Sequence, residues 1–219
     1  MHTSPFYKSE SKNMKFILGR KLNMTQIFDA SGAALPVTAV SVRSNVVTQV
    51  RTKDVDGYEA LQVGEGSKNP NRINKPQKGH FKELGSFAAV AEFRDFSDKA
   101  GAPTLKVGDK VELGQFAAGD MVTVSSISKG KGFQGVVKRH GFGGGPRSHG
   151  QKHSEREPGS IGGGLRTRVP VGMRMAGRMG SDRITVKNLK VVHIDQEESV
   201  MYVSGAIPGK RGTLVEIVA

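Results

Sequence analysis

The sequence of 219 residues contains no cysteine and no tryptophan, and only 6% of its residues are aromatic. Without cysteine the chain can form no disulfide scaffold, no thiolate zinc site and no cysteine nucleophile, and it fits a reducing compartment. No run of about 18 consecutive apolar residues occurs, which excludes a transmembrane helix. Residues 1–13, MHTSPFYKSESKN, lack an apolar core, so they do not form a secretory signal. We expect them to be a disordered extension before a folded part that starts at Met14.

Acidic residues are scarce relative to basic ones. The chain has 33 lysines and arginines against 20 acids, a formal net charge of +13. A balance this basic points to an anionic partner, either nucleic acid or an anionic membrane surface. The excess is concentrated, because residues 129–183 contain twelve cations, only three acids and 15 of the 29 glycines. The rest of the chain resembles an ordinary, mildly basic domain.

Short segments rich in β-branched residues, separated by Gly, Asp and Pro turns, predict a mainly β protein with a barrel or sandwich. Asp56-Gly57 is a hairpin-type turn. The only helical pattern, a modest one, covers residues 80–87. The predicted strands are 37–42, 46–52, 58–63, 121–127, 184–194, 200–203 and 214–218.

Two stretches interrupt this pattern, so we expect a barrel core of residues 14–128 and 184–219. Residues from about 64 to 104 are polar and broken by proline, which predicts a small inserted subdomain. Residues 129–183 are too long for an ordinary loop and too poor in apolar side chains to order themselves. Glycine permits close backbone approach, and the cations favour phosphate contact over a merely solvated surface. This stretch therefore predicts an extended arm that folds against RNA and recognises mainly the shape and the phosphates of the folded RNA.

Several motifs within the arm suggest other chemistry. Residues 130–135, GKGFQG, match G-x-G-x-x-G, but the following segment is too short for the helix of a dinucleotide site, and the required acid is missing. Ser148 and Ser160 sit in incomplete nucleophile elbows. His140, His149 and His153 could form a metal cluster, although contact with phosphate or bases is the favoured interpretation. Glu155 and Glu157 are expected to be internal counter-charges for the arginines.

The motifs taken together resemble the large-subunit ribosomal protein three family, in its bacterial form, over residues 14–219. No single motif is specific, but their order along the whole chain is. The matching stretches are LGRKLNMTQIF (18–28), GHF (79–81), EFR (92–94), VGD (107–109), SKGKGFQG (128–135), KRHGF (138–142), GGP (144–146), SHG (148–150), PGSIG (158–162), MAG (175–177) and MG (179–180).

The resemblance implies a translation-protein-type β-barrel with a small inserted α/β subdomain and a long extended loop. It also implies a structural, non-catalytic protein that binds ribosomal RNA, acts early in subunit assembly and extends an arm towards the peptidyl transferase centre. Many bacterial relatives have a modified glutamine directly after the Ser-Ile-Gly motif. Here Gly163 occupies that position, so the modification cannot occur there.

We accordingly expect a cytoplasmic, ribosomal protein without a cofactor, metal, membrane or small-molecule ligand. Its expected partners are 23S-type ribosomal RNA and neighbouring large-subunit proteins; the alternative is a free-standing RNA-binding assembly factor. Glycines expected to let the backbone approach RNA are Gly130, Gly132, Gly135, Gly143, Gly144, Gly145, Gly162, Gly163 and Gly164. Side chains expected to bind RNA are Lys129, Lys131, Lys138, Arg139, His140, Arg147, His149, Lys152, His153, Arg156, Arg166, Arg168, Arg174, Arg178 and Arg183.

Overall fold

The computed structural model describes residues 15–94, 105–164 and 167–219. The described chain divides into two compact units. One, the barrel unit, comprises the described residues up to Ile127 together with Ile184–Ala219. The other, the loop unit, comprises those of Ser128–Arg183. Among the described residues, no helix is both long enough and apolar enough to cross a membrane.

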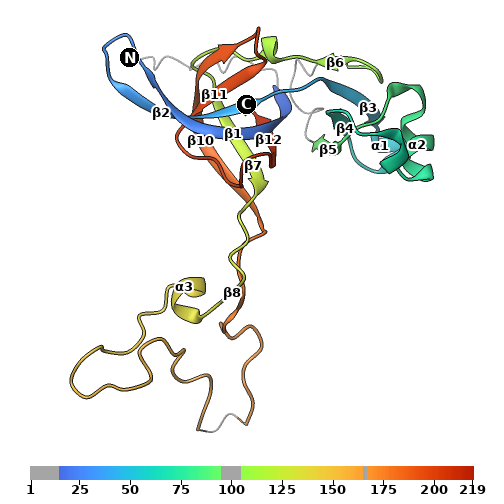
Figure 1. Cartoon of the computed structure of the whole chain (residues 1–219). Helices are drawn as coiled ribbons and strands as arrows, with labels where there is room; N and C mark the ends of the chain where they lie inside the picture. The colour runs from blue at the N-terminus through green and yellow to red at the C-terminus, as the bar shows by residue number, and fades with distance from the viewer. Residues whose placement is uncertain (1–14, 95–104, 165–166) are drawn as a thin grey trace, which may run out of the picture. The chain divides into compact units, whose positions relative to one another are not determined.

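Six strands of the barrel unit close into a β-barrel in the order β1-β12-β7-β10-β11-β2 (Figure 1). The mainly β prediction and the barrel are thus confirmed. β1 closes the barrel because its first part pairs with β12 and its second part with β2, across a register shift between Lys21 and Met24. The strands are β1 (Phe16–Phe28), β2 (Ala34–Ser41), β7 (Met121–Ile127), β10 (Arg183–Asp195), β11 (Val200–Ser204) and β12 (Leu214–Val218).

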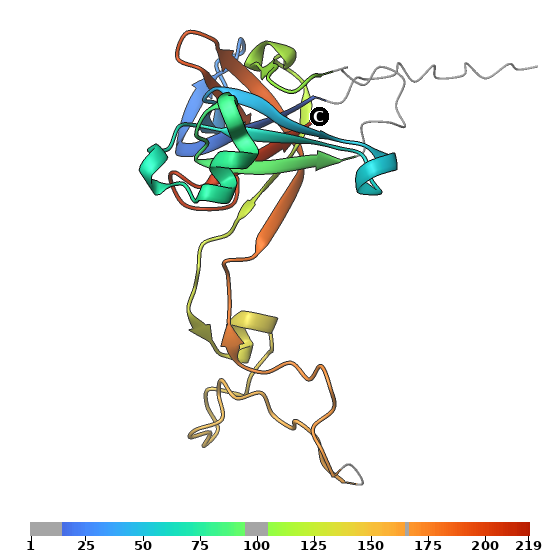
Figure 2. The same ribbon diagram turned by 90° about the vertical axis from the view of Figure 1, so that its right-hand side faces the viewer.

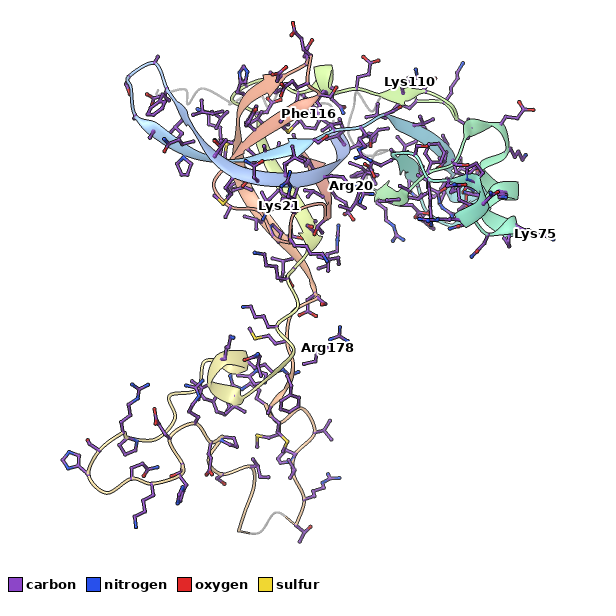
Figure 3. The ribbon with its side chains drawn as sticks, in the orientation of Figure 1. Arg20, Lys21, Lys75, Lys110, Phe116 and Arg178 are labelled. Atoms are coloured by element: carbon purple, nitrogen blue, oxygen red, sulfur yellow. The ribbon has the colours of Figure 1, made fainter. Side chains whose placement is uncertain are left out.

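Inward-facing valines, isoleucines and methionine fill the barrel. Alternate residues of β12, Val215 and Ile217, are fully buried in this cluster, as the period of two along a strand requires. Phe116, after the short helix η3 (Leu113–Gln115), joins the same cluster (Figure 3). The barrel is therefore a packed core rather than a ligand cavity.

A second sheet, in the order β5-β4-β3-β6, packs against the outside of β1 (Figure 2). Its strands are β3 (Asn45–Arg51), β4 (Ala60–Glu65), β5 (Ala89–Arg94) and β6 (Lys110–Val111). Phe16 and Leu18 of β1 face this sheet, whereas Ile17 between them faces the barrel interior. A strand buried on both faces is apolar at consecutive positions, which explains the Phe-Ile-Leu run.

Polar side chains join the two sheets at β1. Asn45 is buried, and its side-chain amide takes the place of a neighbouring strand: the Leu18 N–H donates to Asn45 Oδ1 (3.1 Å), and Asn45 Nδ2 donates to the Leu18 carbonyl (3.0 Å). Arg20 reaches from β1 to the fully buried carboxylate of Glu65 on β4 (2.9 Å). Without these partners, burying the Asn45 amide and the Glu65 carboxylate would strongly destabilise the fold.

The helical elements differ from the predicted one. α2 covers Lys75–Phe81, with Pro76 in its first turn, and continues into the 3₁₀ turn η2 (Lys82–Leu84). The predicted helix, residues 80–87, overlaps only the end of this region, because the proline start signal precedes it. Two more short helices are α1 (Lys53–Asp56), which makes the β3–β4 turn and ends at Gly57 (φ 78°), and η1 (Pro70–Arg72).

Candidate nucleic-acid interface

The loop unit begins as a two-stranded stem. The Ser128 N–H donates to the Asp182 carbonyl (2.9 Å), and the Lys131 N–H donates to the Met179 carbonyl (2.9 Å). The pairing ends in β8 (Phe133–Gln134) and β9 (Gly177–Arg178). Gly180 is required here, because its φ is +80° and a Cβ would lie 2.2 Å from the Lys129 carbonyl oxygen.

A five-residue helix, α3 (Val136–His140), follows β8 and ends at Gly141 in the left-handed conformation (φ 72°). The sequence pattern excluded a dinucleotide-type helix after Gly135, and the structure shows that a short helix does start there. At five residues it remains shorter than the helix of a dinucleotide site. The G-x-G-x-x-G match therefore leads into a compact turn of the loop unit.

α3 is held by two side chains predicted to bind RNA. Arg139 Nη1 donates to the Met175 carbonyl (2.7 Å), and His140 Nε2 also donates to it (3.1 Å). Both side chains are half-buried. The structure thus gives Arg139 and His140 a bracing contact within the loop unit, in addition to the RNA role proposed for them.

Close backbone approach occurs at Gly144 and Gly145, but it is to the protein's own chain. A Cβ at Gly144 (φ +71°) would lie 2.2 Å from the Glu155 carbonyl oxygen, and the Gly145 N–H donates to that oxygen (2.9 Å). Glu155 also pairs through its carboxylate with Arg147 (2.6 Å), which confirms its predicted counter-charge role. A Cβ built at Gly132, Gly135, Gly143, Gly163 or Gly164 would meet no described atom within 4 Å beyond its chain neighbours.

The remaining candidate cations lie open to solvent. Within the described part of residues 128–183, Val136 is the only buried residue. Arg166 lies outside the described residues. Arg174 stacks over the Phe142 ring, 4.9 Å from its centroid, so one of the two aromatic rings of the unit is already covered by a cation. The exposed candidates are Lys129, Lys131, Lys138, Arg147, His149, Lys152, His153, Arg156, Arg168, Arg174, Arg178 and Arg183.

These features define what the unit can do. It has almost no apolar core, so contacts within the unit alone stabilise its conformation weakly. The described residues bring together no group of three or more His, Asp or Glu side chains that could hold a metal ion. An exposed cationic chain on a short stem suits an extended anionic polymer better than a small substrate.

A second cationic stretch was missed by the sequence analysis. Residues 68–82 contain five cations and no acid, a higher density than the loop unit has. Charge counting over the whole remainder of the chain averaged this cluster with the acidic residues elsewhere. A window of about 15 residues, the span of the cluster itself, would have found it.

The fold and the exposed charge define a class: a basic β-barrel protein with a glycine-rich, cationic loop unit. Comparison with known proteins gives the family. Residues 82–206 match the family model described as ribosomal protein L3. The chain is 49% identical to the large ribosomal subunit protein uL3 of Herpetosiphon aurantiacus, over 92% of this chain and 94% of the relative.

Two further relatives have the same name. The protein from Streptomyces coelicolor is 47% identical over 94% of this chain and 95% of its own length, and the one from Bacillus mycoides is 44% identical over 93% and 95%. The chain belongs to the ribosomal protein L3 family. Because this family is a structural component of the ribosome, the chain is not an enzyme. The resemblance inferred from the sequence motifs is confirmed.

Proposed function

We propose that this protein is a structural constituent of the large ribosomal subunit in the cytoplasm and that it binds 23S-type ribosomal RNA directly through the loop unit. In this role the barrel unit anchors the protein, and the loop unit is an arm that penetrates folded RNA towards the peptidyl transferase centre. Neighbouring large-subunit proteins complete its surroundings, and binding early in assembly orders the arm. The protein contributes no catalysis of its own.

One observation supports this proposal above the others: among the described residues of the loop unit, more than 50 in number, one side chain is buried and twelve candidate side chains are exposed. Ordering each residue costs about 1–2 kcal/mol of backbone entropy, and so small a core does not offset it. Contact with phosphates supplies the missing stabilisation through charge neutralisation and release of counterions. Membership of the ribosomal protein L3 family supports ribosomal RNA as that polyanion.

The test is the salt dependence of RNA affinity. The full-length variant with Lys152, Arg156, Arg168 and Arg174 all changed to Gln should bind a transcript of large-subunit ribosomal RNA more weakly. Each lost phosphate contact should reduce the slope of log affinity against log salt by about 0.7–0.9, or about 3 for four contacts. Filter binding or fluorescence anisotropy from low to physiological salt measures this slope.

A matched control removes the same charge from the barrel unit, through Gln at Lys187, Lys190, Lys210 and Arg211, which are all exposed. It should leave the slope within about one unit of the parent. Equal slopes for the loop variant and the parent protein would refute binding by the loop unit. Sedimentation of cell extract separates the alternative, since an assembly factor is lost from salt-washed mature large subunits and a constituent stays at one copy per particle.

A further inference from the structure

The segment from Lys68 to Lys82, which includes η1 and α2, presents five cations that form no ion pair with any described residue. The segment contains no acid. In the same unit, Arg20 and Arg51 pair with carboxylates at 2.9 Å and 2.6 Å. None of the segment's own cations has such a partner among the described residues, and all are exposed; one of them, Lys75, is labelled in Figure 3. We call this the α2 surface, and its cations are Lys68, Arg72, Lys75, Lys78 and Lys82.

Beside these cations lies a cavity of about 620 Å³, between α2–η2, β3 and the segment before β6. Its lining combines three apolar side chains, Phe81, Leu84 and Val107, with the polar side chains of Thr48, Gln49, His80, Lys82 and Glu83. This volume lies in the range of small-ligand pockets, in which a few polar groups stand beside apolar ones. Such a mixed lining suits a nucleobase, which has apolar faces and hydrogen-bonding edges.

His80 forms a fixed wall of this cavity. Its Nε2 donates to Gln62 Oε1 (2.7 Å), and Thr48 Oγ1 donates to the same oxygen (2.9 Å). The ring of His80 also packs edge-on against Phe81, with centroids 5.4 Å apart. The imidazole is therefore held in one orientation before any ligand binds, as a stacking platform requires.

The backbone at Lys82 is unusual. Its φ is 47° and its ψ is −120°, a conformation that non-glycine residues rarely adopt. Lys82 lines the cavity described above and also a smaller one of about 260 Å³ beside it, which shares Phe81 and Glu83 with the first. Strained backbone of this kind persists where the surrounding structure enforces it, commonly at binding sites.

We propose that the α2 surface is a second RNA-binding site, which takes an unpaired segment of RNA: its cations hold the phosphates, and the larger cavity holds one unstacked base against His80. An RNA strand matches five exposed cations that outnumber the one neighbouring acid, Glu83, and an unstacked base matches a cavity with both apolar and hydrogen-bonding side chains. The inference rests on the proposed binding of ribosomal RNA but uses a part of the chain separate from the loop unit. An acidic protein segment would match the cations but not the cavity.

The charges are tested by changing Lys68, Arg72, Lys75 and Lys78 to Gln in the full-length chain. The salt slope for large-subunit ribosomal RNA should fall by about 3, as four phosphate contacts predict. The control is the variant with Gln at Lys187, Lys190, Lys210 and Arg211, which removes the same charge elsewhere on the barrel unit. An equal fall in both variants would show a net-charge effect and overturn the site.

The cavity is tested at Gly79, which lines it. A Cβ there meets no described atom within 4 Å, so a larger side chain fits on α2 without a clash. Gly79→Phe should fill the cavity and weaken RNA binding by roughly 5- to 140-fold, the range expected for one lost base stack, without changing the salt slope. Gly79→Ala adds only a methyl group and should bind as the parent does. Unchanged affinity of a folded Gly79→Phe variant would overturn the base pocket.

The absence of cysteine allows the site to be located directly. A Gln77→Cys variant, on α2 but outside the cavity lining, and a Ser148→Cys variant each place one thiol in the chain, where iron–EDTA can be attached to cleave nearby RNA. We expect cleavage at different RNA positions from the two sites. No RNA cleavage from position 77 in assembled subunits would overturn the second site in favour of a protein partner. The two proposals can fail separately. If the α2-surface variant weakened RNA binding and the loop-unit variant did not, RNA binding by the loop unit would be refuted and the α2 site would be supported.

Discussion

Replacing Arg20 with methionine should lower the free energy of unfolding of the barrel unit by about 3–5 kcal/mol, because it strands a buried charge. The side chain of Glu65 is 0% exposed, and Arg20 is its cationic partner. Arg20 Nε lies 3.2 Å from both carboxylate oxygens, and Nη2 lies 2.9 Å from one of them. Methionine keeps much of the aliphatic volume but leaves the carboxylate without a counter-charge.

The reverse substitution should have a smaller effect. Glu65→Gln removes the buried charge and keeps an amide oxygen that can accept from Arg20. The Arg20 side chain is 27% exposed and its guanidinium also donates to the Gly212 carbonyl (3.2 Å), so it can regain contact with solvent. We expect a loss of about 1–2 kcal/mol, in the range of a weakened hydrogen bond to a charged group. Urea unfolding followed by circular dichroism measures both variants.

Arg147 provides the control, since its ion pair is shorter but exposed. The Arg147–Glu155 distance is 2.6 Å, and the two side chains are 82% and 43% exposed. Arg147→Met should therefore change stability by at most about 1 kcal/mol. If Arg20→Met had as small an effect as Arg147→Met, or a smaller one than Glu65→Gln, burial would not be what decides the strength of this pair.

Two further predictions concern other parts of the chain. Gly180→Ala should weaken RNA binding more than Gly172→Ala, because both have φ near +80° but only at Gly180 would a Cβ meet the Lys129 carbonyl oxygen; equal affinities would contradict this. Burial raises the pKa of the Glu92 carboxyl, but hydrogen bonds from Tyr58 and Arg51 outweigh burial and hold this pKa below its ordinary value of 4.5. A lowered folded-state pKa adds stability above the ordinary value and loses it as the pH falls below about 4.5, so Glu92→Gln should flatten the acid limb of the unfolding midpoint against pH.

Most of the strands could be predicted from the sequence, but the longest N-terminal one could not. β1 (Phe16–Phe28) has no clean alternation, because Phe16 and Leu18 face one core, Ile17 faces the other, and the register then shifts after Lys21. A period-two pattern presupposes one buried face, and β1 has two. Its pairing with both β12 and β2 is a tertiary property that local sequence does not contain.

The sequence also did not predict which strands belong to the barrel and which belong to the second sheet. The predicted strands 46–52 and 58–63 exist as β3 and β4, yet they pair with β5 and β6 rather than within the barrel. Their antiparallel hairpin follows from the short connection at Gly57, but a hairpin can join any sheet that covers its apolar face. The selecting contact is Asn45, whose side chain bonds the backbone of Leu18 on β1.

Composition predicted the charge of the candidate interface better than its geometry. Exposure of the cations follows from their number, since three acids cannot pair twelve of them. The inward orientation of Arg139 and His140 does not, because it depends on the Met175 carbonyl, more than 30 residues further along the chain. Likewise, the sequence predicted that Gly144 lets the backbone approach RNA, whereas in the structure the Glu155 backbone occupies the space beside it.

Cations paired with carboxylates and cations in excess of acids lie in different parts of the chain, and this contrast argues for where RNA binds. In the barrel unit, Lys15, Arg20 and Arg51 each reach a carboxylate, and a large apolar core already stabilises the fold around them. In the loop unit and on the α2 surface, cations stand in excess of the acids beside them. Unpaired cations repel one another and destabilise a free protein, so their concentration in two places is explained by a polyanion that neutralises both. A partner that touched only the loop unit would leave the α2 cations without that compensation.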